Sequence, residues 1–121
     1  MSHVTEKLRT KVNRWASSAS MEAQELRDTT EKSGCCLVEA AHDRDRVSLQ
    51  GTLRTVTLRP RGGVPALEAE LYDGSGVITV IWLGRRRIAG IQPGRRVKVD
   101  GRIGVHGGVR VMFNPRYELR Y

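Results

Sequence analysis

The sequence predicts an all-β fold: a small antiparallel barrel of five short strands, preceded by a helical N-terminal extension. Three observations support this prediction. The period of the apolar residues changes from helical to alternating at Arg46. Five alternating segments follow, separated by turns that are rich in glycine. The first segment is long and changes parity along its length, which is typical of a bent strand that pairs with two neighbours.

Residues 1–45 are predicted to form the helical extension and a connector, and residues 46–121 the β domain. The first helix is indicated by an apolar stripe at i, i+4, i+8 and i+11, made of Val4, Leu8, Val12 and Trp15. Ser20 is expected to cap a second short helix. Residues 35–45 then read as a connector that lies against the domain through residues such as Val38.

The first predicted strand begins at Arg46. One face carries Val47, Leu49, Gly51 and Leu53. After Thr55 the apolar positions switch parity, so a bulge or strong bend is expected within this strand.

The second and third strands are predicted to form a hairpin. Leu67, Ala69 and Leu71 alternate with Glu68 and Glu70, and the glycines of "DGSG" (73–76) suit a tight turn. In the third strand one face carries Ile78, Val80 and Trp82. Because Trp82 shares the parity of two aliphatic residues, it is expected to fill the barrel interior.

Residues 84–94 read as a short helical or irregular crossover to the fourth strand, whose inner face carries Val97, Val99, Gly101 and Ile103. The fifth strand has Val109, Val111 and Phe113 at the parity expected for the core, stops at Asn114-Pro115 and resumes at Tyr117 and Leu119. A bent first strand can close a small barrel, and a crossover after the third strand can cover its end. That arrangement is the OB-fold.

Three segments strengthen this assignment, "RVSLQGTLRTV", "LEAELYDGSGVITVIWLG" and "IQPGRRVKVDGRI". Residues 46–119 resemble the OB domains of class II aminoacyl-tRNA synthetases and the wedge domain of a replication-fork helicase. The full string is similar to small actinobacterial OB-fold proteins that carry a helical N-terminal extension. The resemblance implies the fold and a nucleic-acid-binding class, and it implies no catalytic domain.

The charge is unevenly distributed. Residues 1–46 balance their charges, so the formal net charge of +8 lies in residues 47–121, mostly as arginine. Arginine offers a fork of donors that suits phosphate, and a basic domain favours a polyanionic partner. The alternative is a solvated basic surface.

Several classes of protein are disfavoured. The sequence shows no catalytic motif, no apolar run of the ~20 residues that span a bilayer, and no signal peptide, so a non-enzymatic, cytoplasmic protein is expected. Cys35 and Cys36 are adjacent and lack the paired spacing of a zinc site. No metal and no cofactor are predicted.

The candidate nucleic-acid ligands come from loops and from outward strand positions. The first loop holds Arg59 and Arg61 beside two glycines, and the fourth loop holds His106. The outward strand positions and the C-terminal part contribute Arg54, Lys98, Arg102, Arg110 and Arg116. Arg85, Arg86 and Arg87 can bind phosphate at the start of a crossover helix, bind an acidic protein, or be solvated.

Two functions remain open. In the first, the domain binds DNA or RNA mainly through phosphates, with little sequence specificity. Exposed aromatic residues for base stacking are scarce, with Tyr72, Tyr117 and Tyr121 as the candidates. In the second, an OB module binds a partner protein through the N-terminal helix or the arginine-rich surface. The acidic residues Glu68 and Glu70 on the second strand favour this alternative.

Overall fold

The structure, a computed structural model, describes residues 17–30 and 34–120. It is mostly β, with one helix over residues 17–30 and the short 3-10 helix η1 (Val38–Ala40). The strands are β1 (Arg46–Leu58), β2 (Ala66–Tyr72), β3 (Val77–Leu83), β4 (Arg96–Arg102), β5 (Gly104–His106), β6 (Val109–Phe113) and β7 (Arg116–Arg120).

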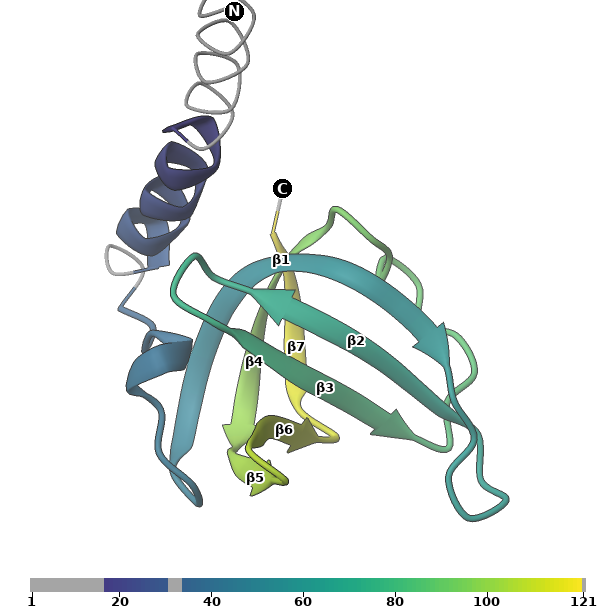
Figure 1. The fold of residues 1–121 in the computed structure, drawn as a ribbon. Helices are drawn as coiled ribbons and strands as arrows, with labels where there is room; N and C mark the ends of the chain where they lie inside the picture. Colours follow the sequence, from purple (N-terminus) through teal and green to yellow (C-terminus); the bar gives the residue numbers. More distant parts are fainter. Residues whose placement is uncertain (1–16, 31–33, 121) are drawn as a thin grey trace, which may run out of the picture.

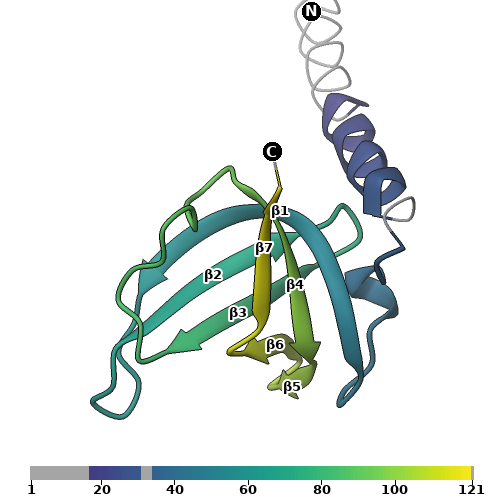
Figure 2. The ribbon, with the colours of Figure 1, turned by 180° about the vertical axis from the view of Figure 1, so that it is seen from behind.

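The strands form one curved sheet in the order β5-β6-β3-β2-β1-β4-β7. Figures 1 and 2 show two layers: β2 and β3 form one, β4 and β7 form the other, and β1 curves over both. This architecture is OB-like.

The predicted count of five strands is wrong, because residues 17–30 and 34–120 contain seven. β5 is a short extra strand that pairs with β6. The predicted fifth strand is divided into β6 and β7 at Asn114-Pro115, where Asn114 has a φ of 49° and Pro115 has no amide hydrogen to donate.

The predicted closed barrel also differs from the structure. β6 pairs with β3 and β7 pairs with β4, and no ladder among the described residues joins these two edges of the sheet. The chain passes between the two layers at Ile103, where β4 leads into β5, and at Asn114-Pro115, where β6 leads into β7.

The predicted bulge in β1 is confirmed. The register with β2 shifts between Leu53 and Thr55, which places Arg54 in the bulge. β1 pairs with β4 over residues 46–52 and with β2 over residues 52–58. One strand is thereby shared between the two layers, as the parity switch predicted.

The core lies between the two layers and contains Trp82, as expected. Leu49, Val80 and Val99 are fully buried, and Trp82 is 5% exposed. The indole Nε1–H of Trp82 donates to the carbonyl oxygen of Pro115 at 3.1 Å. This bond fixes the tryptophan against the turn between β6 and β7.

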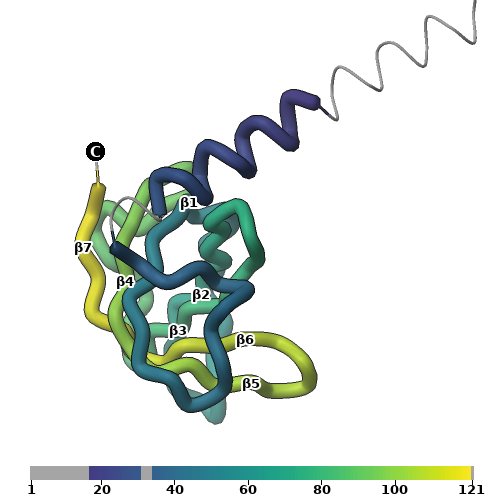
Figure 3. Tube along the Cα trace, turned by 90° about the vertical axis from the view of Figure 1, so that its left-hand side faces the viewer, coloured from purple at the N-terminus to yellow at the C-terminus, as the bar shows by residue number. Residues whose placement is uncertain are grey.

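The connector is part of the same packing unit. Val38 is fully buried in the core. At the end of the helix, Thr30 donates its hydroxyl to the carbonyl oxygen of Gln50, and Arg27 Nε donates to the carbonyl oxygen of Gly74 at 2.9 Å. Figure 3 shows the rest of the helix projecting away from the sheet. The predicted domain boundary at residues 45–46 stays a prediction.

The helical predictions concern the N-terminal extension and the crossover after β3. Ser20 lies inside the helix and does not cap it, because an exposed serine costs a helix only a few tenths of a kcal/mol. The stripe from Val4 to Trp15 lies outside the described residues. The crossover at residues 84–95 is irregular, since Gly84, Gly90 and Gly94 adopt positive φ angles of 76°, 84° and 86°.

Candidate functional site

A groove lies on the outer face of β2, β3 and β6, beside the β1–β2 loop and the β5–β6 hairpin. We call it the first groove, and its volume is about 410 Å³. It is lined by Arg61, Glu68, Thr79, His106, Val109, Val111 and Phe113. Two of the predicted ligands, Arg61 and His106, are therefore brought together.

Phe113 is the principal correction to the predicted site. The sequence placed it in the core, but its side chain is 43% exposed. Met112 fills the interior instead, fully buried, while Val111 is buried in a second, smaller core cluster with Ala66 and Ile81. The face assignment of β6 was inverted because one buried methionine, rather than an alternating set, defines its inner side.

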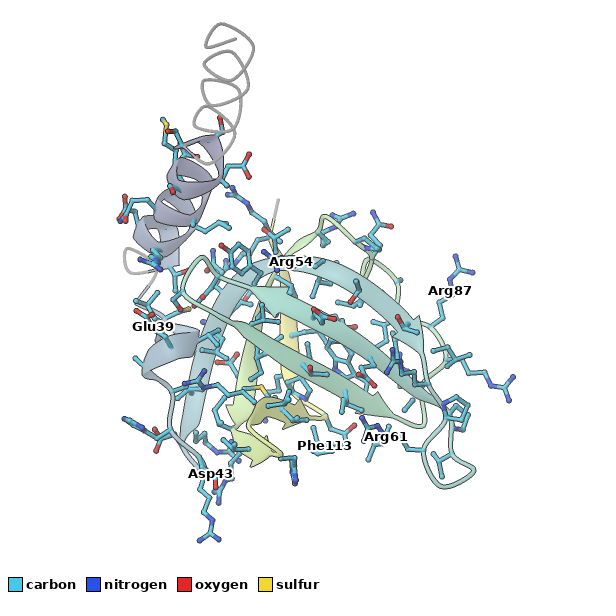
Figure 4. The ribbon with its side chains drawn as sticks, viewed as in Figure 1. Glu39, Asp43, Arg54, Arg61, Arg87 and Phe113 are labelled. Atoms are coloured by element: carbon cyan, nitrogen blue, oxygen red, sulfur yellow. The ribbon has the colours of Figure 1, made fainter. Side chains whose placement is uncertain are left out.

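The ring of Phe113 lies near two polar side chains, those of His106 and Arg61. The His106 ring meets it edge-on with centroids 6.3 Å apart, and the Arg61 guanidinium carbon lies 5.9 Å from the ring centroid. Figure 4 shows Arg61 and Phe113 next to each other below β3. The arrangement offers an exposed aromatic ring beside a cation.

The net charge of the first groove is small. Arg61 forms an ion pair with Glu68 at 3.3 Å, and these side chains are 47% and 17% exposed. The negative charge of Glu68, which would repel a phosphate, is therefore partly neutralised, and the same ion pair occupies Arg61. Glu70 is exposed on the same strand.

A second groove, of about 790 Å³, lies on the other side of Phe113. It is lined by Arg46, Val47, Ser48, Asp100, Gly101, Arg102, Phe113, Asn114 and Arg116. The predicted ligands Arg102 and Arg116 meet here. Arg46 was missed, although its place at the start of the first alternating strand was visible in the sequence.

The other predicted ligands lie apart from both grooves. Arg54 stacks on Tyr72, with its guanidinium carbon 3.8 Å from the ring centroid. Arg110 donates to the carbonyl oxygens of Ala41 and Glu39, both at 3.2 Å, and so holds the connector. Lys98 lies on the outer face of β4.

The predicted arginine ligands not yet placed are exposed on loops. Arg59 follows β1, and Arg85–Arg87 follow β3. The expected helix N-terminus at Arg85–Arg87 is absent, because this stretch is irregular. Arg87 projects away from the sheet in Figure 4.

The tyrosines proposed as stacking residues line neither groove or lie outside the described residues. Tyr72 lies under Arg54. Tyr117 is 40% exposed and meets Trp82 edge-on with centroids 5.8 Å apart. Tyr121 lies outside the described residues. Phe113 is thus the aromatic ring that the grooves present.

Cys35 and Cys36 are free thiols. Burial raises the pKa of the Cys36 thiol, and the carboxylates of Asp45 and Asp73 add to the effect, so this thiol stays protonated near neutral pH. Among the described residues no three His, Cys, Asp or Glu side chains gather as metal ligands do. No helix in the described part of the chain is long and apolar enough to cross a membrane.

Comparison with known proteins gives a likeness of fold. No protein-family model and no curated protein matches the chain. Among solved structures, the chain is similar to a structure of RecG bound to a three-way DNA junction, with a TM-score of 0.55 and 19% sequence identity. The match covers 64% of this chain and 11% of the other, so this chain spans a small fraction of that protein.

Proposed function

We propose that the protein is a non-enzymatic OB module that binds nucleic acid with little sequence specificity, using the first groove. The observation that carries this proposal is the exposed ring of Phe113, flanked by Arg61 and His106. Every base has a π-face, so an exposed ring binds bases of any sequence, and stacking contributes about 1–3 kcal/mol per base.

The composition of the groove fits a base and its backbone. Val109 and Val111 supply apolar surface beside the ring. Arg61 and His106 supply donors for phosphate or for base edges. The bound DNA in the RecG structure supports a nucleic-acid ligand for this fold. The finer resemblances to synthetase, fork-helicase and actinobacterial OB proteins, and the cytoplasmic location, stay predictions.

A polarisation titration tests the proposal. Labelled single-stranded DNA, duplex DNA and structured RNA are titrated at two salt concentrations with the wild type and with Phe113→Ala. The variant should bind about 5- to 150-fold more weakly, as the loss of one stacked base predicts. Val77→Ala removes an exposed side chain at the opposite end of β3 and is the matched control.

The titration has two results that count against the proposal. Absence of binding by the wild type at low salt would remove nucleic acid as the ligand. Equal binding by Phe113→Ala and wild type would move the site away from the first groove.

A partner protein is the second candidate function. A hollow of about 310 Å³ is lined by Leu58, Pro60, Gly63, Pro65 and Arg86. Leu58 is 49% exposed, and the nearby loop residue Val64 is 45% exposed. An exposed apolar surface bordered by arginine fits a peptide with apolar and acidic residues. Binding of such a peptide that is lost in Leu58→Asp, with no binding of nucleic acid, would favour this function.

A further inference from the structure

The second groove carries more positive charge than the first. Arg46, Arg102 and Arg116 line it, against the single carboxylate of Asp100. That carboxylate accepts a hydrogen bond from the hydroxyl of Ser48. Among the described residues, neither of the two ion pairs involves these three arginines. Their guanidinium groups are free to bind an anion.

The three arginines come from three adjacent strands. Arg46 of β1 lies directly opposite Arg102 of β4, and Asp100 of β4 lies opposite both Ser48 and Arg116. Directly opposed residues of antiparallel strands point to the same face. The cations are thus gathered on one outer face by the sheet itself, and binding a ligand requires no loop to be ordered.

Phe113 lines both grooves and connects them. It is the last residue of β6, immediately before the Asn114-Pro115 turn that leads into β7. The first groove lies on the face of β2, β3 and β6, and the second on the face of β1, β4 and β7. A ligand that occupies both grooves must therefore bend at Phe113, where β6 turns into β7.

We propose that the second groove binds backbone phosphates of the same strand whose base stacks on Phe113. This inference rests on the proposed function and specifies its ligand as a single strand that turns at Phe113. A duplex is too stiff to follow this path, because its persistence length is about 150 base pairs. A single strand bends freely between successive phosphates, and OB-folds bind about 4–16 nucleotides.

The two grooves then contact different parts of the strand. The first groove, where Arg61 is paired with Glu68, mainly contacts the base. The second groove neutralises phosphates and produces most of the salt dependence. Each phosphate that it neutralises on a single strand should contribute about 0.7 to the slope of log affinity against log salt.

A length series tests this arrangement. Oligothymidylates of about 4 and about 12 nucleotides span the range of OB-fold sites and are titrated at several salt concentrations. The Arg102→Ala/Arg116→Ala variant should bind the longer strand with a slope shallower by roughly 1.4, and the shorter strand almost unchanged. Arg85→Ala/Arg87→Ala removes the same charge from the exposed loop, away from every groove described above, and is the matched control.

Each outcome decides between the two proposals. If the wild type binds the longer strand and the groove variant matches it in affinity and slope, the second groove is excluded and the proposed function stands. If the control variant loses as much affinity and slope as the groove variant, the loss reflects only the lower net charge of the protein, and the second groove is again excluded. If a duplex binds as tightly as the longer strand and is weakened equally, the single-strand path is wrong. If the wild type binds no strand, both proposals fail. Arg46→Ala repeats the test should the double variant not fold.

Discussion

Asp73 should hold the connector against the β2–β3 turn and thereby contribute to the free energy of unfolding. Its side chain is fully buried and accepts four hydrogen bonds. Oδ2 accepts the Val38 N–H at 2.7 Å. Oδ1 accepts the Ser75 N–H at 2.9 Å, the Ser75 hydroxyl at 2.7 Å and the Gly76 N–H at 3.1 Å. The carboxylate thus links two segments that lie 35 residues apart.

Asp73→Asn replaces one carboxylate oxygen with an NH2 group, which cannot accept a hydrogen bond. If the amide oxygen stays with the turn, the buried Val38 N–H loses its acceptor. A hydrogen bond to a charged group contributes about 1.5–3 kcal/mol, so the free energy of unfolding should fall by about that amount. Asp73→Ala removes all four bonds and should cost more.

Urea denaturation monitored by tryptophan fluorescence measures these changes, because Trp82 is buried in the core. Ser75→Ala is the control in the same turn, since it removes hydroxyl bonds and leaves the carboxylate in place. It should cost about 1 kcal/mol. If Asp73→Asn is no less stable than Ser75→Ala, the carboxylate does not hold the connector.

Three further results are expected. Trp82→Ala should lower the free energy of unfolding by about 3–5 kcal/mol in the same assay, and a melt like that of the wild type would contradict the core assignment. Arg110→Ala should lower stability by about 1 kcal/mol with unchanged affinity for nucleic acid, because Arg110 holds the connector; an affinity loss in a stable variant would place it in the site. In Cys35→Ser, Cys36 should react with a disulfide reagent at pH 8 more slowly than after unfolding in urea, because burial raises the pKa of this thiol. Equal rates would contradict the partial burial of Cys36. The stability that the neutral thiol provides should be lost as the pH rises through that raised pKa.

Most of the fold could be predicted from alternation. Val80 and Trp82 share a face in the sequence and a core in the structure. The parity switch in β1 correctly located the bulge near Arg54. These predictions succeeded because an antiparallel strand with one buried face has a period of two, and a bulge shifts that period by one residue.

The candidate site was harder to predict because it depends on pairings that alternation does not show. Phe113 has the parity of Val111, yet Met112 fills the main core, Val111 is buried in a separate small cluster, and Phe113 is exposed. Arg110 looks like any outward arginine, but its partners lie about 70 residues away in the connector. Side chains that lie far apart in the sequence come together here only through the sheet order.

Mapping by NMR locates the ligand on the protein residue by residue. Amide shifts of the 15N-labelled protein are recorded as an oligothymidylate of about 12 nucleotides is added, a length within the range of OB-fold sites. If the strand occupies both grooves, the shifted amides cluster at Thr79, His106, Val109 and Phe113, with a second cluster at Arg102 and Arg116. Shifts confined to residues 84–87 or to the helix at 17–30 would show that the strand binds elsewhere.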